Sequence, residues 1–279
     1  MTKSSRQPED GFVAGPFGRI HYLEMGAGAP LVLLHSAGSS AHEFAHIIGR
    51  LAEYFHVVAW DMPGHGDSDP LPHHLTIADY STALLSLIER LGLKQPHLLG
   101  TSIGAQIVAC VAKQPMEVAS VSLVELPLRS RAEWTKIWPL VETMFSCPTQ
   151  SFEQVAPRFR DLQQSDLTRW NIDRNKVGAK AMMSAMWALR DHCLDLSAIV
   201  APTLLLYGEM GAVAESIPLA TAALPRATVV KIPECGHFPM IDDPLAFGEI
   251  IRAFVSSHIG PQIAPHEQKK QQGSRQRVK

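Results

Sequence analysis

The sequence lacks the features that mark several large classes of protein. Its four cysteines are far apart and form no CxxC pair, so we expect free thiols in a reducing compartment. Its thirteen histidines are scattered, with His73 and His74 the only adjacent pair, and we predict no metal site. The polar start, MTKSSRQPEDG, does not resemble a signal peptide. No apolar run approaches the roughly 20 residues that span a bilayer. These absences predict a cytoplasmic protein without a membrane partner. The cysteines are Cys110, Cys147, Cys193 and Cys235.

The chain also lacks a strong charge of either sign. A formal net charge of -2 provides no basic field for nucleic acid and no strongly acidic patch. With 46% hydrophobic and 19% charged residues, the composition is that of an ordinary globular protein with a sizeable core. Its 279 residues are enough for one large α/β domain with an insertion. We therefore expect a small-molecule substrate and no nucleic-acid partner, and the oligomeric state stays open.

Short apolar runs alternate with longer amphipathic ones. The short runs predict strands that are buried on both faces, as a parallel sheet covered by helices requires. The longer runs have helical spacing and length. The alternation predicts an α/β fold with a doubly wound, mostly parallel sheet. The predicted strands cover 31–34, 56–60, 97–99, 120–124, 203–207 and 228–232, and the helices 41–54, 76–92, 103–114 and 244–258.

One stretch, 127–201, contains only helix-compatible segments punctuated by prolines. We predict that it is a helical cap inserted into a core made of 1–126 and 202–259. Its aromatic and Met side chains could line an apolar substrate pocket or pack the cap onto the core. The first ten or so residues are polar and expected to be loose, and 260–279 has the composition of a disordered tail. The cap side chains are Trp134, Trp138, Trp170, Trp187, Met182, Met183 and Met186.

The segment HLLGTSIG, 97–104, contains the most informative motif. It reads as an apolar strand, a G-x-S-x-G turn at 100–104 and the start of a helix. The two glycines permit a cramped turn that exposes the hydroxyl of Ser102 above the sheet. The N-terminus of the following helix would direct its N–H groups toward developing negative charge. The context predicts that Ser102 is a nucleophile.

Together with other landmarks, this segment resembles the nucleophile elbow of the α/β-hydrolase superfamily. His35–Ser39 follows an apolar strand where the family carries its oxyanion loop, and Asp61–Ser68 is similar to the family's D-x-P-G-x-G-x-S turn. Gly236–Phe238 follows the last predicted strand, where the family carries its catalytic histidine. The resemblance covers about residues 18–257 and implies a cofactor-free serine hydrolase.

The resemblance assigns roles to several residues. His237 is expected to be the base that activates Ser102. The backbone N–H groups of Ala37 and Ile103 are expected to form the oxyanion hole. Ser36 departs from the family, which usually has glycine after the loop histidine. Its hydroxyl is either a tolerated small group, which we favour, or a group with a chemical role.

The acid of the triad is missing from its usual place. After TLLLYG the family pattern is close to G-x-x-D, and this chain has Gly211 at the aspartate position. Three carboxylates could substitute. Glu125 ends the preceding predicted strand and is our choice, whereas Glu209 and Glu215 lie on the loop itself. It is also possible that no acid is present, which would slow turnover without abolishing it.

Other residues have weaker signals. Asp61 is expected to be structural, and Asp242 and Asp243 precede Pro244 where N-capping carboxylates belong. The predicted substrate contacts are Ser36, Trp134, Trp138 and Phe238. Four arginines of the cap could meet a substrate carboxylate, although charged residues on such helices are more often solvated: Arg129, Arg131, Arg158 and Arg160.

Three functions are compatible with these residues. The first is hydrolysis of a small carboxylic ester, lactone or thioester through an acyl-serine. The second is carbon–carbon bond hydrolysis or a lyase reaction on the same fold, motivated by Ser36 and the missing acid. The third is ligand binding by a retired hydrolase scaffold, since fold alone does not guarantee activity.

Overall fold

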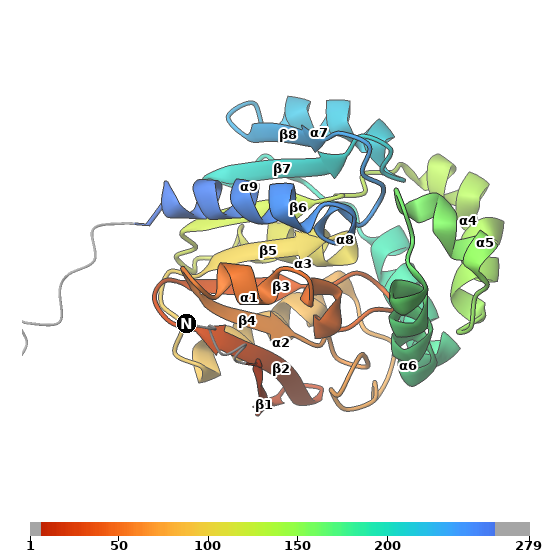
Figure 1. Ribbon diagram of the computed structural model, residues 1–279, viewed down its shortest axis with the longest axis horizontal. Coiled ribbons are helices and arrows are strands. Elements are labelled where there is room, and N and C mark those ends of the chain that lie inside the picture. The colour runs from red at the N-terminus through yellow and green to blue at the C-terminus, as the bar shows by residue number, and fades with distance from the viewer. Residues whose placement is uncertain (1–6, 260–279) are drawn as a thin grey trace, which may run out of the picture.

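A single eight-stranded sheet forms the centre of the computed structural model, which describes residues 7–259 (Figure 1). The strand order is β1-β2-β4-β3-β5-β6-β7-β8. The strands from β4 to β8 along this order pair in parallel, whereas β1 and β2 pair antiparallel at one edge. The bounds are β1 Glu9–Gly15, β2 Gly18–Gly26, β3 Pro30–Leu34, β4 His56–Trp60, β5 His97–Thr101, β6 Ser120–Val124, β7 Thr203–Gly208 and β8 Thr228–Ile232.

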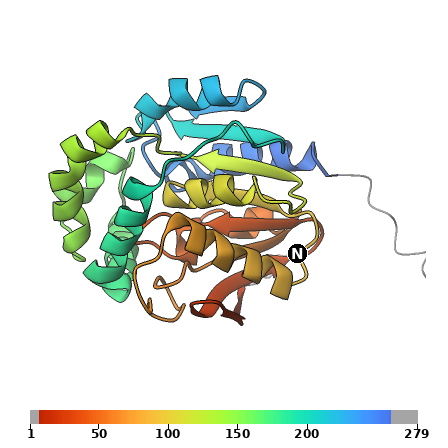
Figure 2. The same cartoon turned by 180° about the vertical axis from the view of Figure 1, so that it is seen from behind.

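Helices cover both faces of the sheet, as Figures 1 and 2 show from opposite sides. One face packs against α2 (Ile77–Arg90), α3 (Ile103–Val111) and α7 (Ile217–Ala223). The other packs against α1 (Ile48–Leu51) and α9 (Pro244–Ser256). Because the central strands are covered on both sides, their apolar runs are continuous rather than alternating. The predicted fold class is confirmed.

The inserted segment forms a layer of helices beyond the carboxyl ends of the parallel strands (Figure 1). It consists of α4 (Arg131–Ser146), the short α5 (Phe152–Val155) and α6 (Gln164–Asp191). Ser130 and Glu133 form a capping box that starts α4. The helix α6 is broken at Gly178, whose φ of 74° and ψ of 158° are not helical. This helical layer, residues 127–201, is called the cap below.

The structure differs from the sequence prediction at both edges of the sheet and in one helix. The hairpin of β1 and β2 was not predicted, because β1 is an exposed edge strand with little apolar pattern. The strand β8 is an edge rather than a strand buried on both faces. The predicted helix over 41–54 is a short 3₁₀ turn, Ala41–Phe44, followed by α1. The tail predicted for 260–279 lies outside the described residues.

Candidate active site

Ser102 lies at a tight turn between β5 and α3. Its φ of 56° and ψ of -115° are strained for a residue with a side chain. The flanking glycines are required by close backbone packing. A Cβ on Gly100 would come within 2.2 Å of the Gly104 carbonyl oxygen, and one on Gly104 within 2.5 Å of the Leu34 carbonyl oxygen. The turn thus holds Ser102 half-buried at the carboxyl end of the sheet.

His237 lies on the loop between β8 and α8 (Pro239–Asp242), and it lines the same pocket as Ser102. The pocket has a volume of about 140 Å³. The backbone N–H of His237 donates to the Arg158 carbonyl of the cap at 2.8 Å. Its ring Nδ1 lies 2.8 Å from Oε2 of Glu125. That hydrogen bond holds the tautomer in which Nε2 is free to accept a proton.

Glu125 is fully buried directly after β6. Its backbone has a positive φ of 48°, and its N–H donates to the Leu206 carbonyl at 2.9 Å. The second carboxylate oxygen, Oε1, accepts from the Gly208 N–H at 2.8 Å. Both oxygens therefore have partners, as a buried carboxylate requires.

The usual acid position, Gly211, lies against this same carboxylate. A Cβ on Gly211 would come within 2.2 Å of Glu125 Oε1. The glycine therefore provides the space that the Glu125 side chain fills. The other two candidate acids are engaged elsewhere, because Glu209 accepts from the Glu234 N–H and Glu215 pairs with Arg129.

Two backbone N–H groups are the predicted oxyanion-hole donors. Ile103 is the first residue of α3, and Ala37 follows β3 on the loop that lines the pocket. Within residues 7–259, neither N–H donates to a protein acceptor. His35 fixes this loop, since its Nδ1–H donates to the Ser36 carbonyl at 2.7 Å and its Nε2 accepts from the Met62 N–H at 3.0 Å. Burial lowers the pKa of His35, which favours the neutral ring that this pattern needs.

The hydroxyl of Ser36 is engaged by a buried carboxylate that the sequence did not single out. Ser36 donates from both its N–H, at 3.0 Å, and its Oγ, at 2.5 Å, to Oε2 of Glu43. Burial raises the pKa of Glu43 despite these bonds. The sequence signal that could have found Glu43 is its H-E-x-x-H spacing with His42 and His46, of which His46 pairs with Asp166 at 3.1 Å. Ser36 lines the pocket, but its hydroxyl proton already has an acceptor.

The rest of the pocket wall comes mainly from the cap and is largely apolar. Trp134 and Phe238, both predicted contacts, line it. Trp138 does not, because its ring packs under Arg190 and its Nε1 donates to Glu142. Trp170 and Met186, two of the cap side chains considered as pocket lining, also line it. The sequence missed the rest of the apolar lining: Ile137, Val141, Met144, Phe145 and Leu189.

The sequence profile of the alpha/beta hydrolase family matches residues 31–250. The chain belongs to this family. It is 30% identical over 254 residues to a pimeloyl-[acyl-carrier protein] methyl ester esterase of Aeromonas salmonicida, covering 82% of this chain and 96% of that protein. By its family and by this likeness the chain is a hydrolase of the carboxylic-ester type.

Solved structures of alpha/beta hydrolases superpose over most of the chain. A membrane phospholipase A is 27% identical with a TM-score of 0.78, covering 90% of this chain and 86% of that one. A thermophilic esterase from Thermogutta terrifontis is 21% identical with a TM-score of 0.73, covering 90% of this chain and 100% of that one, and shows the fold. In this hydrolase, no helix of residues 7–259 is long and apolar enough to cross a membrane.

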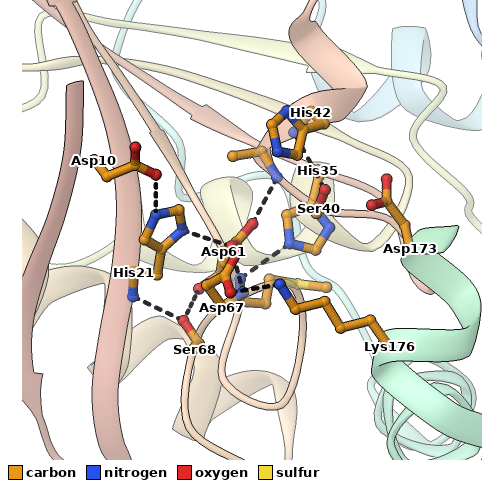
Figure 3. Close-up of polar contacts among 12 residues, drawn as sticks. Asp10, His21, His35, Ser40, His42, Asp61, Asp67, Ser68, Asp173 and Lys176 are labelled. Atoms are coloured by element: carbon orange, nitrogen blue, oxygen red, sulfur yellow. Dashed lines mark hydrogen bonds and ion pairs between the residues drawn. The ribbon is translucent and has the colours of Figure 1, made fainter. Parts of the chain in front are cut away.

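The turn that carries Asp61 connects β2 to the segment that follows the predicted oxyanion loop (Figure 3). Asp61 accepts from the Ala41 N–H at 2.6 Å, from the Asp67 N–H at 2.8 Å and from His21 Nδ1 at 2.7 Å. A Cβ on Gly66 would come within 2.0 Å of the Asp61 carboxylate, so glycine is required there. The predicted structural role of Asp61 is consistent with these contacts.

The network around Asp61 extends in both directions. His21 Nε2 lies 3.0 Å from Asp10 on β1, and Asp67 pairs with Lys176 on α6 of the cap (Figure 3). His21, Asp61 and Asp67 lie close enough together to suggest a metal site. Hydrogen bonds and an ion pair already engage their ligand atoms, so we interpret the cluster as a structural brace.

The two aspartates near the end of the chain have separate roles. Asp243 caps α9 by accepting from the Ala246 N–H at 2.9 Å, as predicted. Asp242 was also expected to be a helix cap, but it accepts from the Gly236 N–H at 2.7 Å and from the Arg160 N–H at 2.9 Å. It thereby fixes the loop of His237 to the cap.

Proposed function

We propose that this hydrolase cleaves a small carboxylic ester, lactone or thioester through an acyl-serine intermediate on Ser102. The observation that carries the proposal is the hydrogen bond from His237 Nδ1 to Glu125, in the pocket that also contains Ser102. An unassisted serine hydroxyl is a poor nucleophile, and an imidazole held in the right tautomer is the base it needs.

The proposed reaction has two halves. His237 Nε2 takes the proton of Ser102 as Oγ attacks the carbonyl carbon, and the N–H groups of Ala37 and Ile103 stabilise the oxyanion. The tetrahedral intermediate collapses as His237 gives that proton to the leaving alcohol or thiol. Water then attacks the acyl-serine with the same base and releases the acid. Glu125 stabilises the imidazolium in both halves.

The test uses a chromogenic short-chain ester. Wild type should show a burst of chromophore equal to the enzyme concentration and be labelled by a fluorophosphonate at Ser102. Ser102→Ala should lose the label, the burst and at least about 10³-fold in kcat. Full activity of Ser102→Ala would refute the proposal. Turnover without a burst or acyl-enzyme would instead favour the lyase alternative, and the absence of both label and turnover would favour a binding protein.

Two observations weaken the alternatives. The lyase hypothesis rested on the Ser36 hydroxyl and the missing acid, but that hydroxyl donates to Glu43. A carboxylate also lies at His237 Nδ1. The retired-scaffold hypothesis rested on the missing acid alone. The cytoplasmic location stays a prediction, with which the four free cysteines agree.

A further inference from the structure

One arginine in the wall of the proposed active site has no acidic partner. Arg158 lines the pocket with Ser102 and His237. Its guanidinium lies over the Trp170 ring, 5.3 Å from the centroid, and its Nη2 donates to the weak acceptor Met144 Sδ at 3.0 Å. Among residues 7–259, no carboxylate lies within ion-pair distance of it.

The other arginine of the same wall is neutralised. Arg129 donates to the Ala212 carbonyl at 3.2 Å and to Glu215 Oε1 at 2.5 Å. Its charge therefore holds the loop after β7 against the cap. Of these two arginines in the pocket wall, Arg129 has an acidic partner among the described residues and Arg158 has none.

In the described part of the chain, a second arginine near the pocket also lacks an acidic partner. Arg174, on α6, is 1% exposed, and its guanidinium also lies 5.3 Å from the Trp170 ring centroid. It donates only to backbone carbonyls, among them those of Pro148 and Cys147, and its Nη1 is buried without an acceptor in the described part of the chain. Two positive charges thus flank one tryptophan at the pocket, and within residues 7–259 neither has an ion-pair partner.

Burial lowers the pKa of Arg158 and of Arg174 to about 10, so both stay protonated at neutral pH. Arg158 is half-buried and Arg174 is fully buried. Removing a charge from water without a counter-ion is costly, and an anionic ligand would offset that cost by supplying the opposite charge. The flat fork of a guanidinium matches a carboxylate. The small pocket favours a carboxylate over a bulkier anion.

We propose that the substrate of this hydrolase carries a free carboxylate that pairs with Arg158, with Arg174 adding to the positive potential behind it. The inference rests on the proposed ester hydrolysis at Ser102. Arg158 is fixed relative to the reacting groups because its carbonyl accepts from the His237 N–H at 2.8 Å. The carboxylate can sit on the acyl part or on the alcohol part of the ester, and the test distinguishes the two.

The experiment compares kcat/KM for matched anionic and neutral esters. The acyl arm uses the monomethyl esters of succinate, glutarate and adipate against methyl alkanoates of equal length. The alcohol arm uses 3-acetoxypropionate against butyl acetate. Wild type should prefer the anionic ester in one arm, by about tenfold to hundredfold, the range of a charge-assisted hydrogen bond.

The variants locate the preference. Arg158→Gln should reduce the anionic-to-neutral ratio at least tenfold, chiefly through KM, and Arg158→Lys should recover part of it because the charge returns without the fork. Arg131→Gln is the matched control. Arg131 is exposed at the start of α4 and is not part of this pocket, so its ratio should equal that of wild type.

Each outcome is decisive. A wild-type enzyme that hydrolyses neutral esters as well as anionic ones in both arms overturns the inference but leaves the proposed function intact. A preference that survives Arg158→Gln also overturns it. If wild type hydrolyses no ester and Ser102 takes no fluorophosphonate label, the proposed function itself has failed.

Discussion

The Glu125 carboxylate fills a space beside His237 that a side chain at position 211 would otherwise occupy. The Glu125 carboxylate reaches it from the end of β6, and a side chain at position 211 would reach it from the loop after β7. The two positions come from neighbouring parallel strands, whose carboxyl ends meet at the same edge of the sheet. An acid from either position can therefore face the same ring nitrogen.

This arrangement predicts that the acid can be moved. Glu125→Gly should lower kcat about 10³- to 10⁴-fold, because His237 loses the group that orients it. The same change relieves the positive φ at position 125. Adding Gly211→Asp to this variant should raise kcat at least about tenfold above that of Glu125→Gly alone, measured with a chromogenic ester.

Two further variants control the experiment. Gly211→Asp alone should lose activity, because its carboxylate collides with that of Glu125. Glu209→Gln should keep kcat near that of wild type, since Glu209 contacts only the backbone of the histidine loop. A folded double variant no more active than Glu125→Gly would show that the two positions do not share a site.

The sequence was sufficient to identify single candidate residues of the site, but not to show which of them contact one another. Ser102 and His237 stand in motifs with fixed neighbours, so their candidacy was evident. Glu125 was one of three carboxylates, and only its distance from His237 Nδ1 separates it from the others. Arg158 and Arg160 are two residues apart and look alike in sequence. The Arg158 side chain lines the pocket, whereas the Arg160 side chain donates to the Asp242 carbonyl, a difference that depends on side-chain direction.

At the scale of elements, α6 combines two helical pieces of different direction. Gly178 separates a first piece that carries Trp170 and Arg174 from a second that carries Met186. Its φ and ψ belong to a region that only glycine occupies readily. The break lets one element contribute both a cationic and an apolar part to the cap.

We predict that Gly178→Ala lowers the free energy of unfolding by about 1–3 kcal/mol, the cost of this backbone conformation. There is open space around the position, so sterics do not contribute. Gly49→Ala is the control, because that glycine also has open space but lies within α1 without a positive φ. Urea unfolding should show Gly49→Ala to be neutral or slightly stabilising. Equal losses in both variants would contradict the assignment.

Elements with strong apolar periodicity were predictable, and those shaped by tertiary contacts were not. The central strands and α2, α3 and α9 lie close to the predicted ranges. The hairpin of β1 and β2 has weak patterning, since it is stabilised by pairing with β4 rather than by full burial. The break at Gly178 was also missed, because a glycine within a polar helical stretch gives no local sign of its φ.

At the scale of the whole molecule, the brace around Asp61 links distant parts of the chain. It joins β1 and β2 at the sheet edge to Ala41, just after the predicted oxyanion loop, and, through Asp67 and Lys176, to the cap (Figure 3). Burial alone would lower the pKa of His21, but its bonds to Asp61 and Asp10 outweigh this effect and raise it.

This raised pKa predicts how stability depends on pH. The pKa of His21 is higher in the folded than in the unfolded protein, where it is about 6.5. Protonated His21 therefore stabilises the folded state fully below pH of about 6.5, and this stabilisation is lost as pH rises through the folded-state pKa. The free energy of unfolding of wild type relative to His21→Asn should therefore fall from pH 6 to pH 9 in urea titrations. His73→Gln, at an exposed position, should follow wild type. Parallel curves for wild type and His21→Asn would refute the prediction.

The hydrogen bond from the His237 N–H to the Arg158 carbonyl limits how substrate can enter. If the whole cap moved away from the core as a rigid body, this hydrogen bond would break, and His237 would be displaced while substrate binds. The segment around Arg158 is also held to the same loop through Asp242. Substrate entry that preserves this geometry must therefore leave the segment around Arg158 in contact with the His237 loop, so any opening of the cap is confined to its other segments.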